Sequence, residues 1–251
     1  MACLHDANSR HTIDVASLRS RPVRRLLQLY AGLVLYGVSM ALMVRSELGV
    51  MPWDVLHQGV ARQLGLSLGT VTILVGILVL LAWVPLRQRP GLGTVSNVVV
   101  IGLAVDAALA LLEPPSALSA RVLFAASGIA LNAVATAAYI GVQLGPGPRD
   151  GLMTGLVRRT GGSVRLVRTA IEVAVVISGW LLGGTLGLVT VAYALSIGPL
   201  VHQLLPRLSV PLPLADDRAT PTAAVPKPRV AARSRSACER RSAASAGSTP
   251  R

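Results

Sequence analysis

The hydrophobic positions of this chain fall into long runs that carry almost no charge and are separated by short polar segments. Each run is close to the ~20 apolar residues that a helix needs to cross the hydrocarbon core of a membrane. Six such runs in one short chain argue against the buried helices of a soluble protein. The predicted spans are Leu26–Val44, Leu68–Leu86, Val95–Leu112, Val122–Gln143, Leu166–Leu182 and Leu186–Leu205.

The glycine, proline and polar positions repeat at a fixed spacing along the chain. Residues 48–54 recur as residues 144–150, an offset of 144 − 48 = 96, with leucine, glycine, proline and aspartate in one register. The same offset pairs Gly32/Gly128, Gly59/Gly155, Gly65/Gly161, Gly91/Gly187 and Gly102/Gly198. Apolar bias alone would not hold these residue types in register. We therefore interpret the chain as a duplicated unit with three spans in each copy.

A unit with an odd number of spans must enter the membrane from opposite sides in its two copies. The sequence thus predicts an all-α membrane protein of six transmembrane helices, arranged as two inverted three-helix repeats at residues 26–112 and 113–205. Inverted repeats are shared by many secondary transporters. Basic tails at residues 1–25 and 206–251 flank the repeats.

Each repeat also contains a short helix after its first span. Pro52 and Pro148 suit a first helical position, and Asp54 and Asp150 then lie in the first turn, where the helix dipole favours them. In the first copy an apolar stripe opposite Asp54 predicts an amphipathic helix, lying at the interface or re-entering the membrane. The stripe consists of Trp53, Leu56, Val60 and Leu64. We expect Trp53 at the outer interface and its repeat mate Arg149 at the cytoplasmic mouth.

Composition supports a membrane location, and the arginines suggest an orientation. The chain is 52% hydrophobic and only 14% charged, whereas a soluble domain carries about a quarter charged residues. Arginines gather in the N-terminal tail, in the loop with Arg87 and Arg89, in residues 149–168 and in the C-terminal tail. Because positive loops stay in the cytoplasm, we predict both termini on the cytoplasmic side of a bacterial inner membrane.

The tails and the cysteines point to partners and exclude several chemistries. The tail from about Pro211 is rich in Pro, Ala, Ser and Arg, which predicts disorder and contact with anionic lipid headgroups. Nucleic-acid binding is rejected because this charge lies beside a membrane without aromatic residues. Cys3 and Cys238 both lie in the tails and form no metal-ligand pattern. No catalytic or dinucleotide motif occurs in a plausible context, so no enzyme, cofactor or metal is expected.

Polar residues within the spans are costly and need a reason. The candidates for a substrate or ion pathway are Asp54, Asp150, Arg149, Asp106, Glu172, His202 and Asn97. Each of these residues also has a structural interpretation that does not involve a solute. The two short-helix aspartates would cap helices, Glu172 would pair with Arg168, and Asp106 and its repeat mate His202 would reach water at span ends. Asn97 and Asn132 would form hydrogen bonds between helices.

Several motifs resemble one known family. They are Leu48-Gly49-x-x-Pro52-Trp53-Asp54, Gly91-Leu92-Gly93-Thr94, Gly145-Pro146-Gly147-Pro148-Arg149-Asp150-Gly151 and Trp180-Leu181-Leu182-Gly183-Gly184. From Leu26 to Leu205 the chain is similar to the YczE/YitT-like bacterial membrane proteins, departing at Val189, where the pattern has a glycine. The resemblance implies an integral inner-membrane protein whose activity is largely unassigned.

The function predicted from these patterns is that of a small-solute or ion-coupled permease, with an unknown small solute as its partner in the bilayer. The alternative is a non-transporting membrane protein that scaffolds or regulates another protein. Self-association into a homo-oligomer is left open by the sequence.

Overall fold

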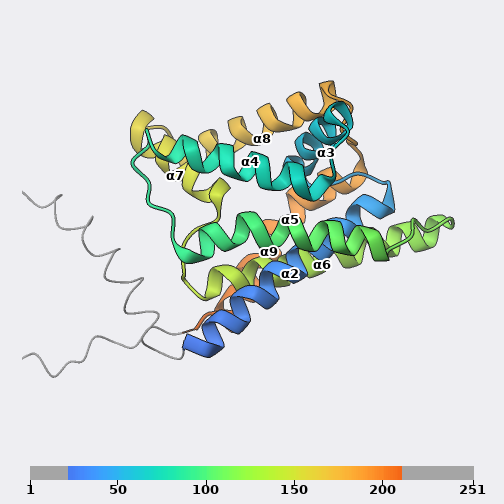
Figure 1. The fold of residues 1–251 in the computed structure, drawn as a ribbon, viewed down its shortest axis with the longest axis horizontal. Coiled ribbons are helices and arrows are strands. Elements are labelled where there is room, and N and C mark those ends of the chain that lie inside the picture. Colours follow the sequence, from blue (N-terminus) through green and yellow to red (C-terminus); the bar gives the residue numbers. More distant parts are fainter. Residues whose placement is uncertain (1–21, 211–251) are drawn as a thin grey trace, which may run out of the picture. The chain divides into compact units, whose positions relative to one another are not determined.

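The computed structural model describes residues 22–210, and within them it forms eight helices (Figure 1). The predicted tails, apart from residues 22–25 and 206–210, lie outside the described residues. The helices are α2 (Pro22–Ser46), α3 (Pro52–Leu64), α4 (Leu68–Trp83), α5 (Leu92–Leu111), α6 (Leu118–Gly141), α7 (Pro148–Thr160), α8 (Val164–Leu181) and α9 (Leu188–Leu208).

The 96-residue offset of the sequence is also the offset of the helices. Helices α2, α3, α4 and α5 begin 96 residues before α6, α7, α8 and α9, respectively, as 118 − 22, 148 − 52, 164 − 68 and 188 − 92 show. The residues that begin and end these helices match as well. Ser67 and Ser163 each cap the following helix, and Gly65 and Gly161 end the short helices with φ of 64° and 67°. Similar local sequences therefore form the same helices twice.

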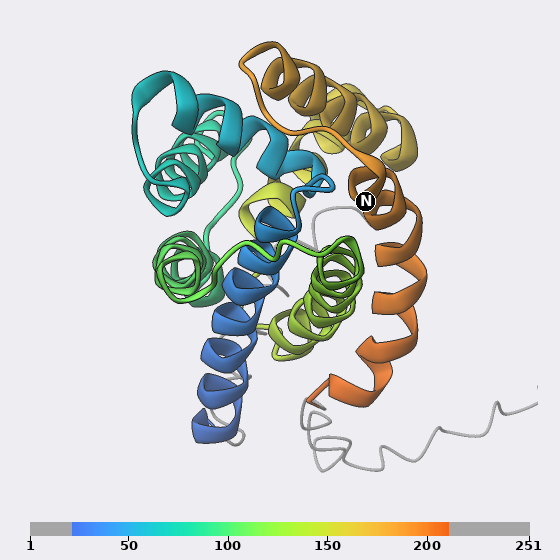
Figure 2. The same ribbon diagram turned by 90° about the vertical axis from the view of Figure 1, so that its right-hand side faces the viewer.

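Helices α2 and α6 cross in the core and run antiparallel, because early residues of one meet late residues of the other. A Cβ on Gly32 would lie 3.2 Å from the carbonyl oxygen of Ala135, and one on Gly128 would lie 3.1 Å from that of Ser39. These two contacts are equivalent at the 96-residue offset. Figure 2 shows the pair between α5 and α9. Large side chains such as Leu33 and Met40 fill the core around this crossing.

Two arginines join the ends of this helix pair in the same reciprocal way. Arg25 donates from Nη1 to the carbonyl oxygen of Val142 at 2.8 Å, and Arg121 donates from Nε to that of Ser46 at 2.9 Å. The last carbonyls of a helix lack partners within the helix, so each arginine satisfies one of them. Arg25, which the sequence assigned to the basic tail, is fully buried in α2.

The short helices are exchanged between the halves. Helix α3 packs on α8 and α7 packs on α4, at opposite ends of the layer that α4 and α8 form (Figure 1). A Cβ on Gly59 would lie 2.5 Å from the carbonyl oxygen of Gly179. At the other end a Cβ on Gly151 would fall 1.9 Å from the ring of Trp83, whose Nε1 donates to the carbonyl oxygen of Pro148 at 3.0 Å. Only glycine permits these approaches.

The linkers before the short helices are exchanged in the same manner. The amide of Gly93 donates to the carbonyl oxygen of Leu144 at 2.8 Å, and the amide of Val189 donates to that of Leu48 at 3.2 Å. The bond is thus kept at Val189, where the family pattern has glycine. Gly49 and Gly145, with φ of 121° and 125°, adopt the left-handed backbone that the linkers require.

The predicted apolar stripe of α3 is only partly buried and does not mark the face that packs most closely. Asp54, His57 and Gly59 face the interior of the molecule, whereas Leu64 is 60% exposed. The reason is that α3 packs through small and polar residues against α8, a neighbour that the periodicity of one helix cannot reveal. The buried Asp54 and His57 argue against a helix that lies flat on the membrane surface, and the bend of 113° between α3 and α4 fits the predicted re-entrant alternative.

Four described helices, α2, α5, α6 and α9, are long and apolar enough to cross a membrane. A fifth span results if α3 and α4, bent by 113°, count as one. The predicted six spans are not all supported, because α4 has only 16 residues and α8 contains Arg165, Arg168 and Glu172. Exposed leucines such as Leu78, Leu103 and Leu195 form an apolar exterior that suits lipid.

Candidate functional site

A cavity of about 410 Å³ lies where α3 and α7 begin, and every helix from α2 to α9 contributes to its wall. Much of the lining consists of equivalent positions from the two halves. Examples are Trp53 with Arg149, Thr72 with Arg168, Asn97 with Tyr193, and Ile101 with Ile197. The cavity therefore lies at the junction of the two copies.

Five of the seven predicted site residues line this cavity. They are Asn97, Arg149, Asp150, Glu172 and His202. Asp54 contacts two residues of the lining, as described below. Asp106 lies outside the lining and accepts hydrogen bonds from the start of α4. The five lining residues come from four different helices, α5, α7, α8 and α9, and meet at this cavity.

Arg149 and Trp53 are repeat mates, and they contact each other. The guanidinium of Arg149 lies over the Trp53 ring, 4.8 Å from its centre, an arrangement in which the ring face attracts the cation. The same guanidinium is 3.9 Å from Oδ1 of Asp54. Both short helices therefore begin at the centre of the molecule. The expectation that Trp53 and Arg149 lie at opposite membrane surfaces is wrong.

A buried polar chain continues from Asp54 into the first half. Oδ1 of Asp54 lies 3.1 Å from Nδ1 of His57, and Oγ1 of Thr72 lies 3.4 Å from the same nitrogen. The side chain of Asp54 is 0% exposed, and among the described residues its Oδ2 has no hydrogen-bond partner. A buried carboxylate with a free oxygen is costly, which makes this position a candidate for function.

Sequence reasoning missed His57, Thr72 and the tyrosines of the cavity wall. His57 follows Asp54 by three residues, a spacing that places two side chains on one face of a helix. That signal was present in the sequence. No comparable signal exists for Tyr36, Tyr139 and Tyr193, because three different helices bring them to the cavity.

Two of the structural alternatives are confirmed by hydrogen bonds. Nε of Arg168 lies 3.0 Å from Oε1 of Glu172, which is the predicted ion pair within α8. Asn132 joins helices, since it donates to Oγ of Ser39 at 2.8 Å and accepts from the hydroxyl of Tyr193 at 2.8 Å. Both residues of this ion pair also line the cavity.

The two short-helix aspartates differ in their surroundings. Asp54 is enclosed by His57 and Arg149, whereas Asp150 is exposed and lines the cavity. Arg149 is 29% exposed on the side chain, so it also remains accessible. The site as a whole offers two cations, Arg149 and Arg168, and two carboxylates, Asp150 and Glu172. Such a set can bind polar or charged groups of either sign.

A protein-family model matches residues 23–206, which include all eight described helices almost completely. Its description is "Family of unknown function (DUF6198)". The chain belongs to this family. The match covers both copies of the repeat together with the short helices and the cavity.

Two curated relatives extend over the same region. An uncharacterized protein of Haemophilus influenzae is 41% identical over 189 residues, covering 75% of this chain and 87% of the relative. The uncharacterized membrane protein YczE of Bacillus subtilis is 29% identical over 180 residues, covering 71% and 84%. No solved structure matches. The expected resemblance to YczE-like proteins is confirmed, and the apolar helices agree that the chain is a membrane protein.

Proposed function

We propose that this protein is a permease for a small polar solute, alone or with a coupling ion, and that the central cavity is its binding site. The observation that carries this proposal is the meeting of two short helix N-termini, Arg149 and Asp150 in one cavity at the junction of two equivalent halves. Broken helices that begin near the middle of a repeat interface form the substrate and ion sites of many transporters.

The reciprocal contacts support an inverted repeat. Equivalent helices α2 and α6 run antiparallel, and several contacts between the halves recur with the partners exchanged, as for Arg25 with Val142 and Arg121 with Ser46. Two copies of one unit related in this way face opposite sides of a membrane. The arrangement gives a binding site at its centre comparable routes to both sides.

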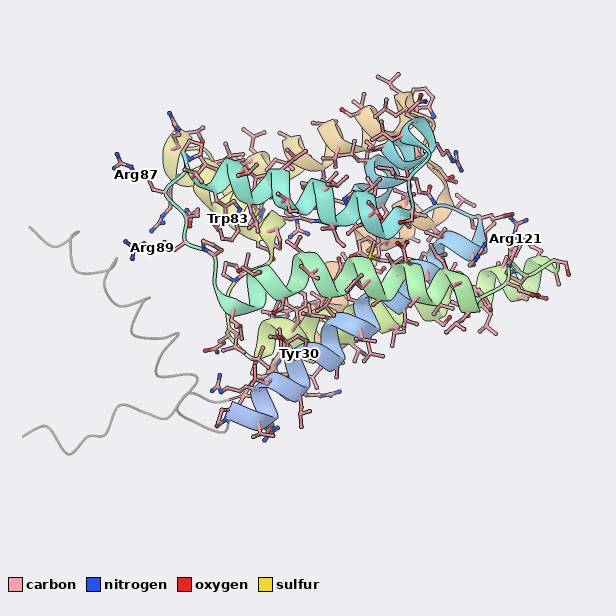
Figure 3. The ribbon with its side chains drawn as sticks, viewed as in Figure 1. Tyr30, Trp83, Arg87, Arg89 and Arg121 are labelled. Atoms are coloured by element: carbon pink, nitrogen blue, oxygen red, sulfur yellow. The ribbon has the colours of Figure 1, made fainter. Side chains whose placement is uncertain are left out.

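The charges favour an orientation with the termini in the cytoplasm of a bacterial inner membrane. Arg87 and Arg89 lie at one end of the described chain, and Arg121 lies at the other (Figure 3). Arg121 is paired with Glu47, so its charge is offset, whereas the end with Arg87 and Arg89 is strongly basic. Positive loops remain in the cytoplasm.

The cavity limits the class of solute. A volume of about 410 Å³ suits a molecule of modest size. Charges of both signs in the wall favour a polar solute with ionic groups over an apolar one. Trp53 and the three tyrosines add surfaces that bind the carbon skeleton or a cationic group of such a molecule.

Uptake into proteoliposomes, measured over a panel of small polar solutes, tests the proposal. Asp150→Ser should abolish uptake of the transported solute without changing expression or thermal melting. Arg149→Gln should also abolish uptake, and it should lower thermal stability as well, because it removes the cation beside the buried Asp54. The N-cap of α7 is Gly147 and not Asp150, so the serine variant removes no cap and separates a carboxylate that acts on the solute from one that only supports α7. Glu47→Gln, outside the cavity, is the matched control and should retain uptake.

One result would instead favour the scaffold alternative. In a strain lacking the protein, the variants Asp54→Asn, Arg149→Gln and Asp150→Asn combined in one chain would restore the full phenotype, and no solute of the panel would be taken up. The cavity charges would then serve the fold, and the proposed transport would be rejected.

A further inference from the structure

The two halves repeat the same helices, but their outer helix pairs are packed differently. Helix α4 packs along α5, whereas the equivalent α8 and α9 make little contact (Figure 2). The difference is visible at equivalent residues. Leu68 at the start of α4 is 8% exposed, and its mate Val164 at the start of α8 is 53% exposed. One face of the cavity is therefore closed and the equivalent face is open.

The closed face is a backbone contact between two glycines. A Cβ on Gly69 would lie 2.0 Å from the carbonyl oxygen of Gly102, and a Cβ on Gly102 would lie 2.7 Å from that of Gly69. No side chain larger than hydrogen fits at either position without moving a helix. Both residues are buried. The two helices meet here more closely than ordinary side-chain packing allows.

Asp106 holds this contact together. Its Oδ2 accepts from Oγ of Ser67 at 2.5 Å, and its Oδ1 accepts from the amide of Gly69 at 2.7 Å. Hydrogen bonds to a charged carboxylate are stronger than neutral ones. The contact lies at the end where α2 finishes, because Arg45 of α2 donates to the carbonyl oxygen of Leu109, one turn beyond Asp106.

None of the contacts between α4 and α5 just described recurs between α8 and α9 at the open face. Gly198, the mate of Gly102, has no heavy atom within 4 Å of the place of its Cβ. Arg165 replaces Gly69 and His202 replaces Asp106, so the same backbone contact cannot form. The cavity lining extends along α9 through Val201, His202 and Leu205, whose mates do not line it. This end is also the one where α2 begins, since Gln28 donates to the carbonyl oxygen of Leu208.

We infer that the cavity is entered between α8 and α9, at the end where α2 begins, and that the α4–α5 contact held by Asp106 is the closed gate at the opposite end. Asp106 is a positioning residue that controls access and does not bind the solute. The role of this gate in transport rests on the proposed function, but the existence of a closed and an open face does not.

Side-specific labelling of a cavity residue tests the inference without knowledge of the solute. The only cysteines are Cys3 and Cys238, so Cys3→Ser with Cys238→Ser gives a full-length chain without thiols. Asn97→Cys or, in a second variant, Met153→Cys then places one thiol in the cavity wall at a half-buried position. A membrane-impermeant maleimide is added to sealed vesicles of either orientation, and the rate of labelling is measured.

The thiol should react from the membrane face where α2 begins and be nearly unreactive from the other face. Asp106→Ala should raise the rate from that other face about tenfold, because it removes two hydrogen bonds of a charged group. Asp106→Asn, which keeps an acceptor oxygen, should raise it less. The matched variant His202→Ala should leave labelling from the closed face unchanged.

Equal labelling from both faces in the parent protein would overturn the inference, and so would an unchanged rate in Asp106→Ala. A rise from both faces together would also overturn it, because general loosening of the fold is not the opening of a gate. Solute uptake is a separate measurement. If no solute is transported but labelling behaves as expected, the permease proposal fails while the gate stands.

Discussion

At the scale of single residues, the contact of Arg149 with its own repeat mate is the most informative feature of the molecule. Trp53 and Arg149 occupy the same position in two copies of one unit, and their side chains meet. Equivalent positions of a duplicated unit come together only near the axis that relates the copies. One copy has tryptophan at this position and the other has arginine. The centre of the cavity therefore contains a cation beside an aromatic ring, whereas two tryptophans would provide no charge.

Replacement of Arg149 should reveal its importance for the buried carboxylate. Arg149→Ala leaves Asp54 without its cation, and we expect a loss of about 1–2 kcal/mol, less than for a fully buried pair because the arginine is partly accessible. The measurement is thermal melting of the purified protein in detergent. Arg168→Ala, which breaks a more exposed pair, should change melting little.

Combining Arg149→Ala with Asp54→Asn should recover most of the lost stability, because the second change removes the unpaired charge. Strictly additive losses in the double variant would show that Arg149 acts through its stacking on Trp53 and not through Asp54.

At the scale of elements, glycines decide which helices approach each other. Gly151 lets α7 reach Trp83 of α4, and Gly59 lets α3 reach Gly179 of α8. Each short helix therefore packs on a helix of the other half as well as on the next helix of its own half. This exchange explains why the glycine-rich motifs recur at the 96-residue offset, since each copy must make the same approach.

The repeat mates Gly102 and Gly198 provide a matched test of this packing. Gly102→Ala should destabilise the protein, because its Cβ would lie 2.5 Å from the Ile73 side chain and 2.7 Å from the backbone oxygen of Gly69. Gly198→Ala meets no atom of another helix and should be close to neutral, because the helix preference of alanine is offset by the steric clash of its Cβ with the following Pro199. Apparent melting temperatures measured in parallel would show the difference. Equal effects would contradict the assigned packing of α4 on α5.

At the scale of the whole molecule, the contacts between loops predict the topology. Nη1 of Arg159, at the end of α7, lies 3.4 Å from the carbonyl oxygen of Pro85, in the loop after α4. The two loops therefore lie at one end of the described chain. Both are rich in arginine, which favours the cytoplasmic side.

Reporter fusions should follow this arrangement. Fusions after Arg89 and after Arg159 should both report the cytoplasm, and fusions after Gln63 and Pro115 should report the outside. Activity of paired cytoplasmic and periplasmic reporters in whole cells is the measurement. An outside signal after Arg159 would require a parallel arrangement of the two copies.

The sequence by itself determined the membrane class, the family and the duplication, because these depend on composition and on local signals that each copy carries. Proline starts, serine caps and left-handed glycines recur at one spacing, and the helices begin where those signals lie. The lengths of the apolar runs predicted the number of membrane spans less reliably. They predicted six spans, whereas charge in α8 and the shortness of α4 leave four or five candidates.

Only the tertiary structure decided how the candidate residues are grouped. Asp106 and His202 are equivalent in sequence, yet one ties α4 to α5 and the other lines the cavity. The apolar stripe of α3 did not mark its most closely packed face for the same reason, because contacts with α8 placed Asp54 and His57 inside. Burial and charge pairing depend on neighbours that are far apart in the chain, and a local pattern contains no information about which helix will pack against it.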